Sequence, residues 1–267
     1  MAQIIAVTNQ KGGVGKTTTA SALVCGLHQR GARVLGVDLD PQGNLGFNLG
    51  LDANGNTVYD VFTGECSVEE AIQPTQYGDV LPSDIMLSAA EVEFTAPRRE
   101  FMLSEMLSGV RGRYDFVIID TPPALNLLTV NAYVASTGLI VPMEAEVLSL
   151  VSVTQLQETI ETVRGSFNPE LKVLGILINK YNGRLTLSKD ILEMAQVVAE
   201  QLDTQVFQAK IHRGVGVAMA PAHGQTVLTY QPDSRPAQDF RAIVDAVAGD
   251  RFPRPKVKQK YSSQFYN

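Results

Sequence analysis

The stretch from Asn9 to Ala20 constrains the fold of this chain more than any other, and it reads NQKGGVGKTTTA. It follows the strand-like run QIIAVT (3–8) and leads into a helical pattern near 16–30, so a strand, a glycine-rich turn and a helix come in sequence. Glycines let the backbone bend until successive N–H groups point at phosphate oxygens. The start of the helix adds the positive end of its dipole. This arrangement predicts a phosphate-binding loop.

Two side chains of this loop have chemistry suited to a nucleoside triphosphate. Lys16 can reach the β- and γ-phosphates, and the Thr17 hydroxyl suits coordination of Mg²⁺. The ordinary pattern GxxxxGK[ST] is broken at one end, because Gln10 stands where it requires glycine and Lys11 follows as a second lysine. The residues expected to bind ATP with Mg²⁺ are Gly12, Gly13, Val14, Gly15, Lys16, Thr17 and Thr18.

Strand-like apolar runs alternate with helical patterns along nearly the whole chain. This alternation predicts an α/β fold, a doubly wound, mostly parallel sheet with helices on both faces. Residues 1–250 are expected to form one domain, with 251–267 a basic, flexible tail, and the region 43–95 is the least regular part. The expected strands are 3–8, 33–38, 79–83, 115–120, 138–143, 172–179 and 204–208, and the expected helices lie near 16–30, 97–109, 125–135, 147–165, 187–202 and 234–248.

Two aspartates stand at the ends of apolar strands, where ligands meet the sheet in this architecture. Asp120 follows the run FVII and fits an acidic residue that acts on Mg²⁺ through water. Asp38 ends the run RVLGVD and is expected to support the metal or its hydration shell. Aspartates at strand ends are often mere caps, so their place in the site is better defined than their separate roles.

Three segments together resemble the deviant Walker A ATPases, the ParA/MinD family: KGGVGKTTTA, VDLDPQGN (37–44) and YDFVIIDTPP (114–123). The stretches NAYVASTGLIVPMEAEVLSL, KVLGILINKYNGR and IHRGVGVAMAPAHG follow in the order seen in ParA-type partition proteins. The resemblance covers residues 1–248 and implies a fold of the P-loop NTPase type. It also implies hydrolysis of ATP to ADP and phosphate, an ATP-dependent sandwich homodimer, non-specific DNA binding, and a ParB-type partner that triggers hydrolysis. Turnover without the partner is expected to be slow, since no arginine finger can be assigned.

The resemblance implies roles for three further residues. Lys11 is expected to act beside Lys16, reaching across a dimer interface to phosphates held by the other subunit, and the alternative is a solvated loop lysine. Asp40 is preferred over Asp38 as the residue that orients the attacking water. Asn179 would lie beside the adenine and pair with its edge, unless it simply forms a turn.

The charge of the chain is unevenly distributed. The net charge is −6, and removing the five positive charges of residues 251–267 leaves residues 1–250 at −11. The net charge of the whole chain argues against a constitutive nucleic-acid binder. The tail allows two interpretations, a solvated end or a loose electrostatic contact with a polyanion.

In the family, non-specific DNA binding uses basic residues on the outer face of the dimer. Each such residue taken singly is also explained as a solvated surface charge. Partition proteins typically have a further arginine and a glutamate where this chain has Gly216 and Met219, which leaves the detailed surface open. The candidate DNA contacts are Arg184, Lys189, Arg213 and Arg235.

Other functions found on this fold have weaker support in the sequence. A membrane-binding tail needs an amphipathic helix, whereas this tail has Pro253 and Pro255 and no apolar stripe. Cys25 and Cys66 are wrongly placed for an iron–sulfur cluster, and their spacing indicates a reducing cytoplasm, with association to the nucleoid implied by DNA binding. A biosynthetic ligase would need a substrate site that is not identifiable. The alternative function is a nucleotide-dependent positioning scaffold for a protein cargo, without DNA.

Overall fold

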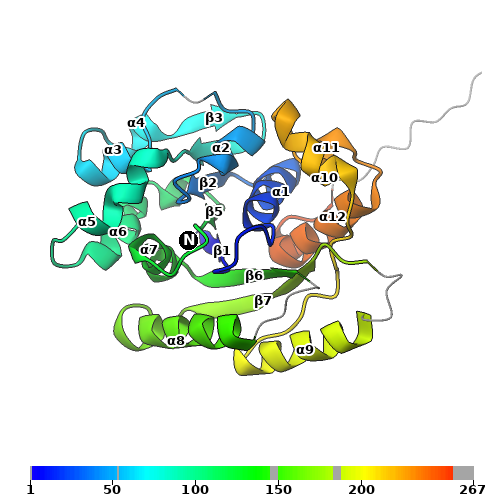
Figure 1. Cartoon of the computed structure of the whole chain (residues 1–267). Coiled ribbons are helices and arrows are strands. Elements are labelled where there is room, and N and C mark those ends of the chain that lie inside the picture. Colours follow the sequence, from blue (N-terminus) through cyan, green and yellow to red (C-terminus); the bar gives the residue numbers. More distant parts are fainter. Residues whose placement is uncertain (1, 53, 145–149, 183–187, 255–267) are drawn as a thin grey trace, which may run out of the picture.

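The computed structural model describes residues 2–52, 54–144, 150–182 and 188–254, and its centre is one twisted sheet (Figure 1). The described strands stand side by side in the order β3-β4-β2-β5-β1-β6-β7. Every pairing is parallel except that of β3 with β4. The expected α/β class with a mostly parallel sheet is therefore confirmed. The strands are β1 (Gln3–Val7), β2 (Val34–Asp38), β3 (Gln73–Thr75), β4 (Gly78–Leu81), β5 (Phe116–Asp120), β6 (Gly138–Glu144) and β7 (Lys172–Asn179).

Helices cover both faces of this sheet, as a parallel sheet buried on both sides requires (Figure 1). The six expected helices are all present, although the one near 97–109 is divided into a short 3-10 turn (Arg99–Phe101) and an α-helix. The described part of the region 43–95 adds four α-helices of four to six residues and a 3-10 helix (Ile85–Ala89) that the apolar pattern did not indicate. The α-helices are α1 (Lys16–Gln29), α2 (Asn44–Asn48), α3 (Val58–Thr63), α4 (Val68–Ala71), α5 (Ala90–Glu93), α6 (Met102–Ser108), α7 (Leu127–Ala135), α8 (Leu150–Ser166), α9 (Ser188–Gln201), α10 (Val215–Met219), α11 (Val227–Tyr230) and α12 (Arg235–Ala248).

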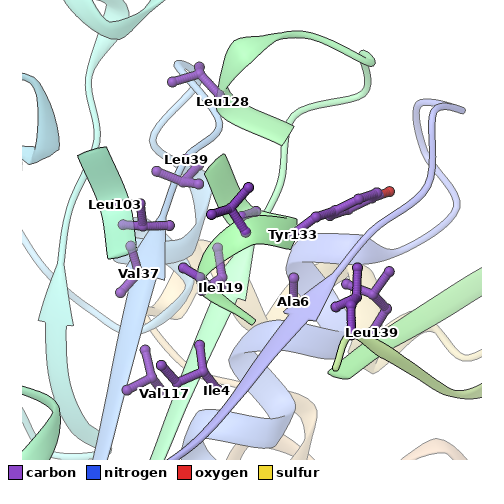
Figure 2. Close-up of a cluster of buried hydrophobic side chains, with 14 of the residues drawn as sticks. Ile4, Ala6, Val37, Leu39, Leu103, Val117, Ile119, Leu128, Tyr133 and Leu139 are labelled. Atoms are coloured by element: carbon purple, nitrogen blue, oxygen red, sulfur yellow. The ribbon is translucent and has the colours of Figure 1, made fainter. Parts of the chain in front are cut away.

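The two faces of the sheet bury two separate hydrophobic clusters. Along β1, Ile4 and Ala6 belong to one cluster and Ile5 and Val7 to the other, which is the two-residue alternation of a strand. The first cluster packs under α6, α7, α8 and α9, and Figure 2 shows part of it around Tyr133. The second packs under α1, α11 and α12. Because the central strands are covered on both sides, almost every residue in them is apolar.

One expected strand was wrong, and the expected tail is only partly described. Residues 204–208 make a single bridge, between Ile176 and Val206, instead of a strand, so they extend the sheet by two hydrogen bonds only. At the start of the tail, the Phe252 ring packs on Phe116 at 5.6 Å between centroids and Arg254 pairs with Asp245. Residues 255–267 lie outside the described residues. No helix within the described ranges is long and apolar enough to cross a membrane.

Candidate nucleotide-binding site

The candidate site forms at the carboxyl ends of the three central strands. In the register of the sheet, Asp120 at the end of β5 stands opposite Val7 of β1 on one side and Asp38 of β2 on the other. The glycine-rich loop leaves β1 at this same edge, and α1 returns from it over the sheet (Figure 1). The sheet therefore brings together the loop and the two strand-end aspartates, which are far apart in sequence.

The loop has the backbone geometry of an anion site. Gly13 and Gly15 have φ of 76° and 93°, values that favour glycine, and a Cβ at Gly12 or Gly13 would meet nothing within 4 Å. Gly15 is the N-cap of α1, and the first turn of that helix contains no acidic residue. No side chain among the described residues caps the first N–H groups of α1. These groups and the positive end of the helix dipole therefore remain available to an anion.

Lys16 is buried inside this loop, with 6% of its surface exposed. Its Nζ donates a hydrogen bond to the main-chain oxygen of Lys11 at 3.1 Å. Burial lowers the pKa of Lys16, and the nearby carboxylates of Asp120 and Asp40 partly raise it again. A phosphate that enters the loop would supply the negative charge that this buried ammonium lacks.

Asp120 has a buried carboxylate without a hydrogen-bond partner of normal geometry among the described residues, at either oxygen. The pKa of Asp120 is raised to about 7, mainly by burial and also by the charge of Asp40, while the Thr17 hydroxyl and Lys16 act in the opposite direction. Orphaned carboxylate oxygens next to a hydroxyl and a phosphate loop fit a hydrated Mg²⁺. No group of three potential metal-binding side chains occurs within the described ranges, so water or phosphate oxygens would have to complete the shell of a cation here.

Asp38 and Asp40 lie on the same turn but make different contacts. The two oxygens of Asp38 accept the N–H groups of Asp40 at 3.0 Å and of Leu45 at 2.9 Å. Burial, followed by the charge of Asp120, raises the pKa of Asp38 well above its ordinary range. Asp38 thus organises the turn after β2, and its expected part in the metal's hydration shell stays a prediction. Asp40 is 9% exposed and points one oxygen at the Gln42 N–H.

Asn179 reaches the loop from the end of β7. Its Nδ2 donates to the Val14 carbonyl at 2.8 Å, and its Oδ1 accepts the N–H of Lys180 at 2.8 Å. A Cβ on Gly15 would lie only 2.0 Å from Nδ2. Asn179 therefore ties down the loop near the start of α1, a contact that the sequence did not indicate. Its contact with adenine stays a prediction.

The candidate DNA residues occupy the region that follows β7. Arg213 donates from Nε to the Lys180 carbonyl at 3.2 Å. Arg235 opens α12 and pairs with Asp239 at 3.1 Å, while 67% of its side chain stays exposed. Lys189 lies in α9, with its side chain outside the description, and Arg184 lies outside the described residues. The structure thus leaves a DNA role for these residues as a prediction.

The raised pKa of Asp120 predicts a pH dependence of stability in the protein without nucleotide. Between its ordinary pKa of 3.8 and about 7, the folded protein binds a proton that the unfolded chain has lost, so the free energy of unfolding should fall as pH rises. The shift corresponds to about 4 kcal/mol at most. Urea unfolding at pH 5 to 8 should show a smaller fall for Asp120→Asn than for the wild type. Parallel pH profiles would contradict the assignment.

Comparison with known proteins gives matches over most of the chain. A family described as "AAA domain" matches residues 2–173. The chain is 43% identical over 235 residues to the chromosome partitioning protein ParA of Caulobacter vibrioides, covering 85% of this chain and 87% of the relative. It is 37% identical over 255 residues to the sporulation initiation inhibitor protein Soj of Bacillus subtilis, covering 94% and 100%. Cobyrinic acid a,c-diamide synthase from Mycobacterium smegmatis, solved with ADP and magnesium, aligns with a TM-score of 0.81 at 37% identity, covering 92% of this chain and 94% of that one.

Proposed function

The chain belongs to the ParA/MinD family of deviant Walker A ATPases, and from this premise we propose that it is a ParA-type partition ATPase. The observation that supports the proposal most strongly is the 43% identity to a chromosome partitioning protein over nearly its full length. The cofactors are ATP and Mg²⁺, and the activity is that of an ATPase. In the proposed cycle, ATP joins two subunits, the dimer binds DNA without sequence preference, and a ParB-type partner stimulates hydrolysis and release.

The geometry of the site supports a separate role for each of its residues in binding and hydrolysing ATP. Lys16 and the free N–H groups of the loop hold the β- and γ-phosphates. Thr17 would be a ligand of Mg²⁺ and Asp120 would hold the water shell of the cation, which would supply positive charge to neutralise the phosphates. Asp40 orients the attacking water, because the turn that Asp38 braces keeps it beside Lys16 and Asp120. Each of these roles is a proposal for the named residue.

Lys11 is the proposed link between ATP and dimerisation. Its side chain is half-buried on the loop and makes no hydrogen bond or ion pair with the described residues, whereas the Lys16 ammonium is bonded within the loop. A second lysine that is not tied to its own loop can neutralise phosphate charge held by another subunit, and this is the role proposed for Lys11. Hydrolysis then weakens the dimer, because the γ-phosphate that both lysines share is lost.

Retention on random duplex DNA tests the proposal as a whole. With ATP, the protein should be retained at low salt and released as salt rises, whereas ADP should give little retention. For a dimer that neutralises about four phosphates, affinity should fall on the order of 100-fold between about 50 and 200 mM salt. Retention that does not depend on ATP, or does not weaken with salt, would contradict the DNA step.

A positioning scaffold for a protein cargo is the second candidate, and one surface favours it. On α10, Val215 is 78% exposed and Met219 46% exposed, and the helix contains no charged residue. Exposed apolar side chains fit a protein contact better than they fit DNA phosphates. ATP-dependent dimerisation without any retention on DNA would favour this candidate over partition.

A further inference from the structure

Asn9 stands between the end of β1 and the two lysines of the loop, and both ends of its amide are bonded. Its Nδ2 donates to the Pro142 carbonyl on β6 at 2.8 Å, and its Oδ1 accepts the N–H of Lys11 at 3.0 Å. The residue is 8% exposed. One buried side chain therefore connects the sheet to the backbone of Lys11.

Pro142 occupies the point at which β6 extends past β1. The two strands pair as far as Val7 and Ile140, and the Thr8 N–H still donates to the Ile140 carbonyl at 3.0 Å. Every second residue of a strand turns its backbone groups to the same neighbour, so Pro142 faces the place that β1 has left. A proline there has no N–H to leave unpaired, and its carbonyl accepts the Asn9 amide in place of the next ladder bond.

The backbone of Lys11 is consequently held at both of its polar groups. Asn9 accepts its N–H, and the Lys16 ammonium donates to its carbonyl at 3.1 Å. The side chain of Lys11 is thus directed by a fixed backbone. Asn9 connects the Lys11 backbone directly to β6, whereas Lys16 is the first residue of α1.

We propose that Asn9 is a positioning residue that fixes Lys11 against β6 so that the Lys11 ammonium is presented to the other subunit. The inference rests on the proposed function, since it takes Lys11 as the lysine that acts across the dimer interface. The two functions of the loop then depend on different residues. Lys16 and the glycines hold the subunit's own nucleotide, and Asn9 positions Lys11 for the contact between subunits.

The test is Asn9→Ala in the full-length protein. ADP affinity, measured by calorimetry, should match the wild type, which also shows that the variant is folded. Dimerisation with a non-hydrolysable ATP analogue, measured by light scattering, should be about tenfold weaker, the effect of roughly one hydrogen bond. Asn131→Ala is the matched control, because Asn131 is also buried, lies on α7 instead of the loop, and has an amide that likewise accepts a backbone N–H, that of Leu103, and donates to backbone carbonyls.

The outcomes separate the inference from its premise. The inference would be overturned if Asn9→Ala dimerised as the wild type does, or if it lost ADP affinity as much as it lost dimerisation. If Lys11→Ala still failed to dimerise, the proposed function would stand. Normal dimerisation of Lys11→Ala would overturn both. A double variant weaker than Lys11→Ala alone would also contradict action through Lys11. If Asn9→Ala does not fold, Asn9→Ser replaces it, because serine keeps an acceptor for the Lys11 N–H but cannot reach Pro142. A loss of dimerisation smaller than that of Lys11→Ala would support the inference. Wild-type dimerisation of Asn9→Ser would overturn it.

Discussion

Lys11→Ala is expected to bind ATP and ADP as the wild type does and to lose ATP-dependent dimerisation. In the proposed site, Lys16 and the loop N–H groups hold the nucleotide of each subunit, and the substitution leaves both in place. The interface, in contrast, loses a cation that faces phosphate charge. Removing one partner of a buried charge pair costs about 2–5 kcal/mol, so the dimer should be at least about 30-fold weaker. Light scattering with a non-hydrolysable ATP analogue measures this directly.

A matched lysine distinguishes the loss of one contact from a general loss of charge. Lys172 is exposed at the first residue of β7, at the opposite end of the sheet from the loop, so Lys172→Ala should dimerise normally. Nucleotide affinity of Lys11→Ala, measured by calorimetry, should stay within error of the wild type. If affinity and dimerisation fell together, Lys11 would be part of its own subunit's phosphate site and the proposed division between the two lysines would be wrong.

The parts of the fold that could be predicted are those in which local pattern and tertiary structure agree. β2, β5 and β1 lie in the centre of the sheet, where burial on both faces requires an uninterrupted apolar run. The short helices α3 and α4 were missed although each starts with a capping box, Thr57 with Asp60 and Ser67 with Glu70, which is readable in a sequence. The sequence indicates such short helices only weakly, because they depend on tertiary packing for their stability.

The residues of the candidate site could be named from the sequence, but the hydrogen bonds that hold the loop in place could not. The loop, Asp38 and Asp120 follow from motifs, because each motif is contiguous in sequence. The bonds from Asn9 to Pro142 and from Asn179 to Val14 join residues 133 and 165 positions apart, so no local pattern indicates them. They exist because parallel strands bring their carboxyl ends to one edge of the sheet, whatever their separation in the chain.

Gly15→Ala is expected to be the most damaging single-methyl change in the loop. Gly15 has φ of 93°, and the added Cβ would lie 2.0 Å from Nδ2 of Asn179. The substitution therefore requires a backbone conformation that alanine rarely adopts and breaks the bond from Asn179 to Val14, together roughly 2–4 kcal/mol. A folded variant that relaxes the loop should lose ATP affinity by about 30-fold or more, measured by calorimetry.

Gly12→Ala is the contrast for that variant, because its Cβ would meet nothing within 4 Å and its φ is not left-handed. Its thermal unfolding midpoint should match the wild type, whereas that of Gly15→Ala should be lower. The double variant Gly15→Ala with Asn179→Ala separates the two sources of the lost stability. Removing the Asn179 amide relieves the clash with the new Cβ but leaves the strained φ. The two substitutions together should therefore lower the stability by less than the sum of their separate effects. Strict additivity would mean that Asn179 does not contact the loop in solution, and its proposed bond to Val14 would have to be given up.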